Sequence, residues 1–164
     1  MSTTTATVPR PAPLWFIDGL VRIHVSGEET GGRYCVVENH VPHGDMPPLH
    51  VHHSEDEVFH VLEGRLSLFL PGRHVELAAG DTFRAPRGVP HTYRVESETA
   101  RLLVLCAPAR FDALVRATAE PAPGEELPPR GRPLDVEALE AAAAEVGIEL
   151  LGPPGALPEP PPAA

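Results

Sequence analysis

Lysine and glutamine are both absent from this 164-residue chain, and all 13 of its cationic side chains are arginine. Without lysine, the chain can form no Schiff base with a carbonyl substrate and cannot contain the lysine-bearing phosphate loop of P-loop proteins. The missing residues, together with abundant Ala, Pro, Gly and Arg, suggest a GC-rich coding sequence. The absence of lysine therefore excludes two large classes of enzyme.

An excess of positive charge is also missing. The formal net charge is −10 at pH 7, and the sequence pI is about 5.3. Because binding to phosphate backbones requires a basic surface, we expect no nucleic acid partner. No stretch approaches the roughly 20 consecutive apolar residues that cross a bilayer, and the N-terminal residues contain no apolar signal-peptide core. These features predict a cytoplasmic protein without membrane contacts.

Cysteine is scarce. Cys35 and Cys106 lie in apolar, strand-like stretches that are far apart in the sequence. A structural disulfide between them is one reading, and two buried free thiols in a reducing compartment is the other. The second reading is favoured, because the chain shows no other sign of an oxidising compartment.

Short apolar segments with alternating polarity, separated by turn residues, occupy the middle of the chain. The length suits one domain, and this pattern is typical of an all-β sandwich or barrel. The segments that read as strands are 20–26, 33–41, 58–62, 65–70, 75–77, 82–85, 91–95 and 101–107.

The pattern changes after Pro108. Apolar residues recur at helical spacing over 111–118, and Asp135 is placed to cap a second, Ala-rich helix over 136–146. We expect these two helices to cover apolar surface at one end of the strands. The predicted organisation is a disordered tail over 1–13, a β-barrel over 14–107, a C-terminal helical extension over 108–151 and a Pro-rich tail over 152–164.

Three histidines and one glutamate stand at positions that suit metal binding. His50 and His52 are two residues apart, so both side chains point the same way in an extended strand. Glu57 has the opposite parity, but the polar residues before it can turn the chain, so Glu57 can face the same centre from the next strand. His91 follows a Pro-Arg-Gly-Val-Pro turn. These ligands suit one divalent transition metal, and Fe, Mn, Ni, Co, Cu and Zn all remain open.

The spacing of these residues resembles the two sequence motifs of the cupin superfamily. The first motif, G-x5-H-x-H-x4-E-x6-G, is matched without a gap, and the second, G-x5-P-x-G-x2-H-x3-N, departs only at Val95, which replaces asparagine. The resemblance implies a cupin double-stranded β-helix, that is, a jelly-roll barrel, with two C-terminal helices added. The matching positions are Gly44, His50, His52, Glu57 and Gly64 in the first motif and Gly80, Pro86, Gly88 and His91 in the second.

Within the cupins, three segments resemble quercetinase-type (flavonol 2,4-dioxygenase-like) proteins: 29–34, 47–59 and 148–154. That resemblance implies a metal-dependent dioxygenase for an aromatic or enol-bearing molecule, flavonoid- or polyketide-like, with O₂ as co-substrate. Glu57 would then be both a metal ligand and the general base that removes the enol proton. His60 stands where these proteins often carry tyrosine, which weighs against the flavonol itself. The resemblance also implies a homodimer.

Side-chain parity extends the expected site. If Glu57 and His91 point inward, then Phe59, Val61, Tyr93 and Val95 do so as well, and they line a mostly apolar substrate pocket beside the metal. Such a pocket suits an aromatic or otherwise apolar ligand with one or two polar atoms.

Alternative readings remain for individual residues. The four ligand residues could form a polar cluster without metal, as in cupins that have lost it. His53 and His60 read as surface groups or as supports for the ligands, and His40 reaches the pocket only if its strand has the right parity. Glu55 and Asp56 read as a solvated turn.

Two alternatives to a dioxygenase also remain. One is a metal-assisted cyclase or isomerase of a similar substrate, which would use the metal as a Lewis acid and consume no O₂. The other is a non-catalytic cupin that binds a small ligand, because the fold hosts both enzymes and binding proteins.

Overall fold

The structure, a computed structural model, describes residues 7–160, so parts of both predicted tails (1–6 and 161–164) lie outside the described residues. Twelve strands and two helices follow one another in this range. Every strand expected from the sequence is present, with ends shifted by a few residues at most. The strands are β1 Leu14–Phe16, β2 Gly19–Val25, β3 Cys35–Pro42, β4 Leu49–His52, β5 Asp56–Glu63, β6 Arg65–Leu70, β7 Arg73–Ala78, β8 Thr82–Ala85, β9 Thr92–Val95, β10 Thr99–Ala107, β11 Glu120–Pro121 and β12 Ile148–Gly152.

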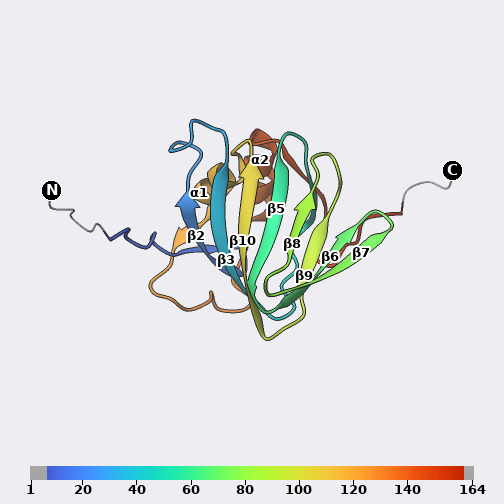
Figure 1. Ribbon diagram of the computed structural model, residues 1–164, viewed down its shortest axis with the longest axis horizontal. Coiled ribbons are helices and arrows are strands. Elements are labelled where there is room, and N and C mark those ends of the chain that lie inside the picture. Colours follow the sequence, from blue (N-terminus) through green and yellow to red (C-terminus); the bar gives the residue numbers. More distant parts are fainter. Residues whose placement is uncertain (1–6, 161–164) are drawn as a thin grey trace, which may run out of the picture.

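The strands form two layers, as the jelly-roll prediction requires. One layer is a seven-stranded sheet in the order β11-β1-β2-β3-β10-β5-β8, whose broad face is seen in Figure 1. The other consists of the sheets β7-β6-β9 and β12-β4, which are linked by an isolated bridge between His50 and His91. Among the described strands, the layers do not close into one continuous barrel, so the architecture is an all-β jelly-roll sandwich.

Alternation along each strand fills the space between the layers. On β10, Leu102, Val104 and Cys106 point inward and are at most 3% exposed, whereas Leu105 points outward and is 36% exposed. On β5 the inward residues likewise alternate with half-buried ones. Because the period of a strand is two residues, the same segments that build the core also aim every second side chain at the site. Cys35 and Cys106 are directly opposed on β3 and β10, which confirms that both are buried free thiols.

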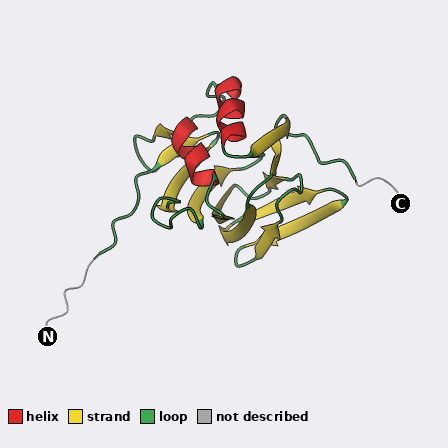
Figure 2. Ribbon diagram, turned by 90° about the horizontal axis from the view of Figure 1, so that it is seen from above, coloured by secondary structure: helices red, strands yellow, loops and turns green. Residues whose placement is uncertain are grey.

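The two helices are α1 Phe111–Thr118 and α2 Val136–Glu145. The carboxylate of Asp135 accepts a hydrogen bond from the backbone N–H of Ala138 at 3.0 Å, so Asp135 is the N-cap that the sequence predicted. Leu114 of α1 and Leu139 of α2 share one buried cluster, and Figure 2 shows both helices together on one side of the strands. No helix in residues 7–160 is long and apolar enough to cross a membrane.

Three strands, β1, β11 and β12, were not expected from the sequence, and β12 is the one that contacts the site. Gly147 ends the turn after α2 with φ +78°, and the next residues form β12, which pairs antiparallel with β4. In this register Ile148 lies opposite His52, and Leu150 lies opposite His50. The C-terminal extension therefore hydrogen-bonds directly to the strand that carries the two candidate ligands.

Candidate metal centre

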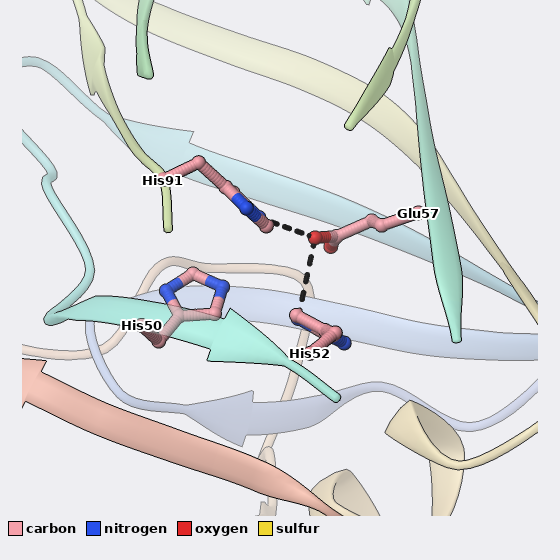
Figure 3. Close-up of side chains that lie close together, drawn as sticks. All are labelled: His50, His52, Glu57 and His91. Carbon is pink, nitrogen blue, oxygen red and sulfur yellow. Dashed lines mark hydrogen bonds and ion pairs between the residues drawn. The ribbon is translucent and has the colours of Figure 1, made fainter. Parts of the chain in front are cut away.

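The structure brings the four predicted ligand residues together. His50 and His52 come from β4 and Glu57 from β5, and His91 directly precedes β9. Their ligand atoms all lie within 4.8 Å of one another, and the four side chains point toward a common centre in Figure 3. His52, Glu57 and His91 are each at most 4% exposed. The cluster could therefore hold a metal ion in a largely enclosed position.

Backbone pairing explains the convergence. His50 and His91 are partners in an antiparallel bridge, with N–H to O distances of 3.2 Å and 2.9 Å in the two directions. Residues that face each other in such a pair project to the same side of the sheet. The polar turn after His52 resets the parity, so that Glu57 also faces the centre, as the sequence predicted.

Two glycines of the motifs have a clear physical role. Gly64 has φ +82°, and a Cβ there would overlap the carbonyl oxygen of Thr99. Gly88 has φ +75°, and its N–H donates to the carbonyl oxygen of His52 at 2.8 Å. A side chain at either position would disturb the turns that hold the ligand strands in register.

Each of the three histidines has its Nδ1 atom against an oxygen. Nδ1 of His50 lies 2.8 Å from the carbonyl oxygen of Pro48, and Nδ1 of His91 lies 3.0 Å from that of Val89. Nδ1 of His52 lies 2.6 Å from Oε1 of Glu55. A carbonyl oxygen can only accept, so Nδ1 of His50 and of His91 carries a proton. Nε2 is then the atom through which each ring can bind a metal, and at His91 the metal would replace the proton that Nε2 donates to Glu57.

Glu57 is the charged centre of the cluster. Its Oε2 atom lies 2.8 Å from Nε2 of His91 and 3.3 Å from Nε2 of His52. Burial alone would raise the pKa of Glu57, but the charges of His52 and His91 and the hydrogen bond from His91 outweigh it and lower the pKa to about 2. The carboxylate is thus ionised at neutral pH and available to a cation.

The pKa values of the two histidines of β4 are shifted in opposite directions. Burial, with the nearby charge of His91, lowers the pKa of His50 to about 3, so its imidazole is neutral and able to ligate. For His52, burial acts in the same direction, but Glu57 and Glu55 outweigh it and raise the pKa. A bound cation would favour the neutral form of both rings.

The prediction of a solvated turn at Glu55 and Asp56 is wrong for Glu55. Its side chain is 1% exposed and bonded to His52, whereas Asp56 pairs at the surface with Arg84 and Arg87. The polar sequence around Glu55 gave no sign of its burial. The i,i+3 spacing from His52 to Glu55 was the one signal that could have indicated the contact.

A narrow, mainly apolar cavity of about 80 Å³ leads away from the cluster. Phe59 and Tyr93 line it as predicted, but Val61 and Val95 do not. Those two valines point to the same side, yet each lies one strand repeat further from the ligands, and both are completely buried in the core. The remaining walls come from segments that sequence reasoning did not assign to the pocket: Phe16, Ile17, Asp18, Gly19, Asn39, Val41, Asp45, Pro47, Pro48, Val104, Phe111, Leu114, Leu139, Ile148 and Leu150.

A second polar group lies in this cavity away from the metal ligands. The hydroxyl of Tyr93 donates to Oδ2 of Asp45 at 3.1 Å. Burial raises the pKa of Asp45 to about 6, although the hydrogen bond from Tyr93 opposes this. The loop that carries Asp45 is fixed to β9, because the N–H of Val95 donates to the Asp45 carbonyl at 3.0 Å. Nothing in the sequence pattern singled out Asp45.

The other histidines of interest stay outside the cluster. His53 is an exposed residue whose Nε2 lies 2.8 Å from Oε2 of Glu149. His60 contacts the hydroxyl of Thr82 on the outer face of the large sheet. His40 has the outward parity of β3, since its neighbours Asn39 and Val41 are the ones that line the cavity.

Comparison with known proteins agrees with this geometry. Residues 37–107 match the cupin domain family. Over 111 residues, which are 68% of this chain and 33% of the relative, the chain is 30% identical to quercetin 2,3-dioxygenase from Bacillus subtilis. In fold, the chain is similar to KdgF from Halomonas sp., with a TM-score of 0.54 at 21% identity over 60% of this chain and 88% of that one.

Residues 37–107 of this chain therefore form a cupin domain, and its His/Glu cluster could hold a metal. Within that class its resemblance is to the quercetinases. A second quercetin 2,3-dioxygenase, from Aspergillus japonicus, is 26% identical over 102 residues, which are 58% of this chain and 29% of the relative. The chain spans only about a third of the length of the quercetinases that it matches.

Proposed function

We propose that this protein is a metal-dependent oxygenase that acts on a compact aromatic or enol-bearing molecule. The observation that carries the proposal is the convergence of three imidazoles and one carboxylate within 4.8 Å, at the inner end of a mainly apolar cavity. Two relatives named quercetin 2,3-dioxygenase support the choice of reaction. The proposal differs from these relatives in the substrate, because the volume of the cavity favours a molecule smaller than quercetin.

The donor set fits a divalent transition metal, because neutral imidazole and ionised carboxylate are ligands that Fe, Mn, Ni, Co, Cu and Zn all accept. His50, His52, Glu57 and His91 would hold it. When bound, such an ion would supply positive charge to stabilise a developing oxyanion and, if redox-active, a route for electrons to dioxygen.

Glu57 is the residue for proton transfer. It is ionised, and its carboxylate is the one anionic group among the four ligand residues, so we assign to it the removal of the enol proton. Without a metal, Nε2 of His91 donates to this carboxylate at 2.8 Å, which keeps it directed at the centre of the cluster. Asp45 and the hydroxyl of Tyr93 would bind a second polar atom of the substrate.

The cavity favours a small substrate. Its volume of about 80 Å³ is below the roughly 150 Å³ of an engineered apolar cavity that binds benzene. The rings of Phe59 and Tyr93, in an edge-to-face arrangement with centroids 6.0 Å apart, supply an aromatic wall. One ring or a compact enol therefore suits the site better than a flavonol with three rings.

The test combines metal analysis with oxygen uptake. Protein purified without added metal is expected to contain about one transition metal per chain and to consume O₂ with single-ring enols faster than with quercetin. His50→Ala should lose the metal and the oxygen uptake, whereas His60→Ala, on the outer face of the sheet, should keep both.

Other outcomes would overturn the proposal in favour of the alternatives. Turnover without loss of O₂ would identify a cyclase or isomerase, and binding without turnover would identify a non-catalytic cupin. Full metal content and oxygen uptake in His50→Ala would show that the cluster is not the site.

A further inference from the structure

Glu55 is a buried carboxylate beside the candidate metal centre but not part of it. It lies in the short connection between β4 and β5, and its side chain is 1% exposed. Oε1 contacts Nδ1 of His52 at 2.6 Å, while Oε2 is buried without a hydrogen-bond partner among the described residues. A buried carboxylate with an unpaired oxygen is costly, so its presence requires a reason.

The contact with His52 gives that reason. An ionised carboxylate can only accept, so the shorter contact, to Glu55 at 2.6 Å, requires a proton on Nδ1 of His52. When the ring is neutral, the lone pair is then on Nε2. Nε2 is the atom that faces Glu57, at 3.3 Å from its Oε2. His50 and His91 are held by neutral backbone carbonyls, which makes His52 the one ligand supported by a carboxylate.

Helix α1 begins beside Glu55. Burial raises the pKa of Glu55, and the contact with His52 and the backbone N–H of Phe111, the first residue of α1, both oppose that rise. The N-cap residue Arg110 makes no side-chain hydrogen bond to the first turn, so the N–H groups there are not occupied by a cap. The positive end of the helix dipole therefore lies toward the carboxylate.

We propose that Glu55 is a positioning residue that fixes the tautomer and the orientation of His52 for metal binding. This inference rests on the proposed function, because it takes the cluster to be a metal site. In known metal sites, removal of a carboxylate that supports a ligating histidine lowers metal affinity by about 10- to 100-fold.

The first experiment needs no variant. Long-range ¹H–¹⁵N correlation spectra of the metal-free protein, recorded at alkaline pH where the imidazoles are neutral, report which ring nitrogen of His52 carries the proton. The inference expects the Nδ1–H form. The Nε2–H form would overturn it, because the proton would then lie on the atom that must bind the metal.

The second experiment measures Co²⁺ affinity by chelator competition. Glu55→Met, which has similar length but no acceptor, should weaken binding by about 10- to 100-fold, and Glu55→Gln, which keeps an acceptor oxygen, should weaken it less. The matched control is Glu149→Met, because Glu149 also contacts a histidine, His53, at 2.8 Å but is exposed. The Co²⁺ affinity of this variant should stay within about twofold of wild type. Urea unfolding of the metal-free proteins separates affinity from folding.

The outcomes distinguish this inference from the proposed function. Wild-type Co²⁺ affinity in a folded Glu55→Met protein would overturn the inference alone. Two Co²⁺ ions per chain with a thiolate absorption band would overturn it too, because Glu55, His52 and Cys106 lie close enough to be ligands themselves. A wild-type protein with the Nδ1–H form but no metal affinity would overturn the proposed function. If Glu55→Met does not fold, the wild-type spectrum and Glu55→Gln decide.

Discussion

The two ends of the cavity come from different parts of the chain. The inner end consists of the four ligand residues, all of which lie within the two cupin motifs of the sequence. The outer end is built by the β1–β2 hairpin, the loop of Asp45, the two helices and β12. The inner end is polar and fixed by strand pairing, whereas the outer end is mainly apolar and depends more on packing between distant segments. Substitutions at the outer end can therefore change which substrate fits without changing the metal ligands at the inner end.

The largest effect is expected at the inner end. Glu57→Gln keeps the size of the side chain but removes the charge that the three histidines surround. We expect metal affinity to fall at least tenfold and kcat to fall by about 100- to 10,000-fold, since both the ligand and the base are lost. Glu63→Gln, on the same strand with a side chain 64% exposed, is the control. Equal metal content and kcat in the two variants would contradict the assignment of Glu57.

A change at the outer end should separate stability and specificity from metal binding. Leu139 of α2 is 3% exposed and lines the cavity, but α2 supplies no ligand. Leu139→Ala should lower the free energy of unfolding by about 2–4 kcal/mol and enlarge the cavity, so that KM falls for larger substrates. Co²⁺ affinity should stay within about twofold of wild type. The control is Val136→Ala, at a residue 53% exposed on the same helix, which should change neither the free energy of unfolding nor KM. A large loss of Co²⁺ affinity in Leu139→Ala would show that the two ends are coupled.

The difference between the two ends also explains what could be predicted from the sequence. The ligands were predictable, because their spacing fixes side-chain direction within each strand and local turns set the parity. Phe59 and Tyr93 were predictable by the same rule, but Val61 and Val95 were not excluded, since parity gives the side of a strand and not the depth along it. The wrong predictions for Val61 and Val95 thus concern how far each residue lies along its strand from the ligands.

Other parts of the outer end could not be predicted by any local rule. β12 reads as the end of a helical extension, and its pairing with β4 depends on the path of the chain through both helices. Glu55 looks like a turn residue, because its burial depends on α1, more than fifty residues later in the sequence. Asp45 enters the cavity only because its loop is bonded to β9. In each case, the missing information is a contact between distant segments.

The free energy of unfolding should depend on pH, because ionised Asp45 at the outer end of the cavity destabilises the folded state. The pKa of Asp45 is raised from 3.8 to about 6, so the folded state holds this proton more tightly than the unfolded state does. The resulting penalty is absent below pH 3.8, grows as the pH rises and is complete above pH 6. A shift of this size corresponds to at most roughly 3 kcal/mol, and partial exposure reduces the expected penalty to about 1 kcal/mol.

Asp45→Asn tests this directly, because the amide oxygen can still accept from Tyr93. The variant should be more stable than wild type by about 1 kcal/mol at pH 7.5, and the difference should disappear near pH 4. Urea unfolding across this range measures it. A stability difference that is constant with pH would show that the charge of Asp45 is not the cause.

The smallest effect concerns the hairpin at the cavity mouth. Phe16 and Gly19 are paired, so Ile17 and Asp18 form a two-residue turn, and Ile17 has φ +53°. This left-handed conformation is unfavourable for a β-branched residue, and the strain amounts to about 1–3 kcal/mol. The backbone is held there by the pairing of β1 with β2 and by the packing of Ile17 against the cluster around Leu139. The strained residue thus lies outside the two cupin motifs.

A pair of variants at Ile17 separates strain from packing. Ile17→Ala and Ile17→Gly lose nearly the same contacts, but only glycine adopts the positive φ without strain. At an ordinary position glycine is the less stable of the two, because its unfolded chain has more freedom. Here we expect the reverse, with Ile17→Gly more stable than Ile17→Ala by about 1 kcal/mol in urea unfolding. The usual order, with alanine the more stable, would mean that the turn relaxes to a negative φ in solution, and the cavity mouth would then be wider than its present lining allows.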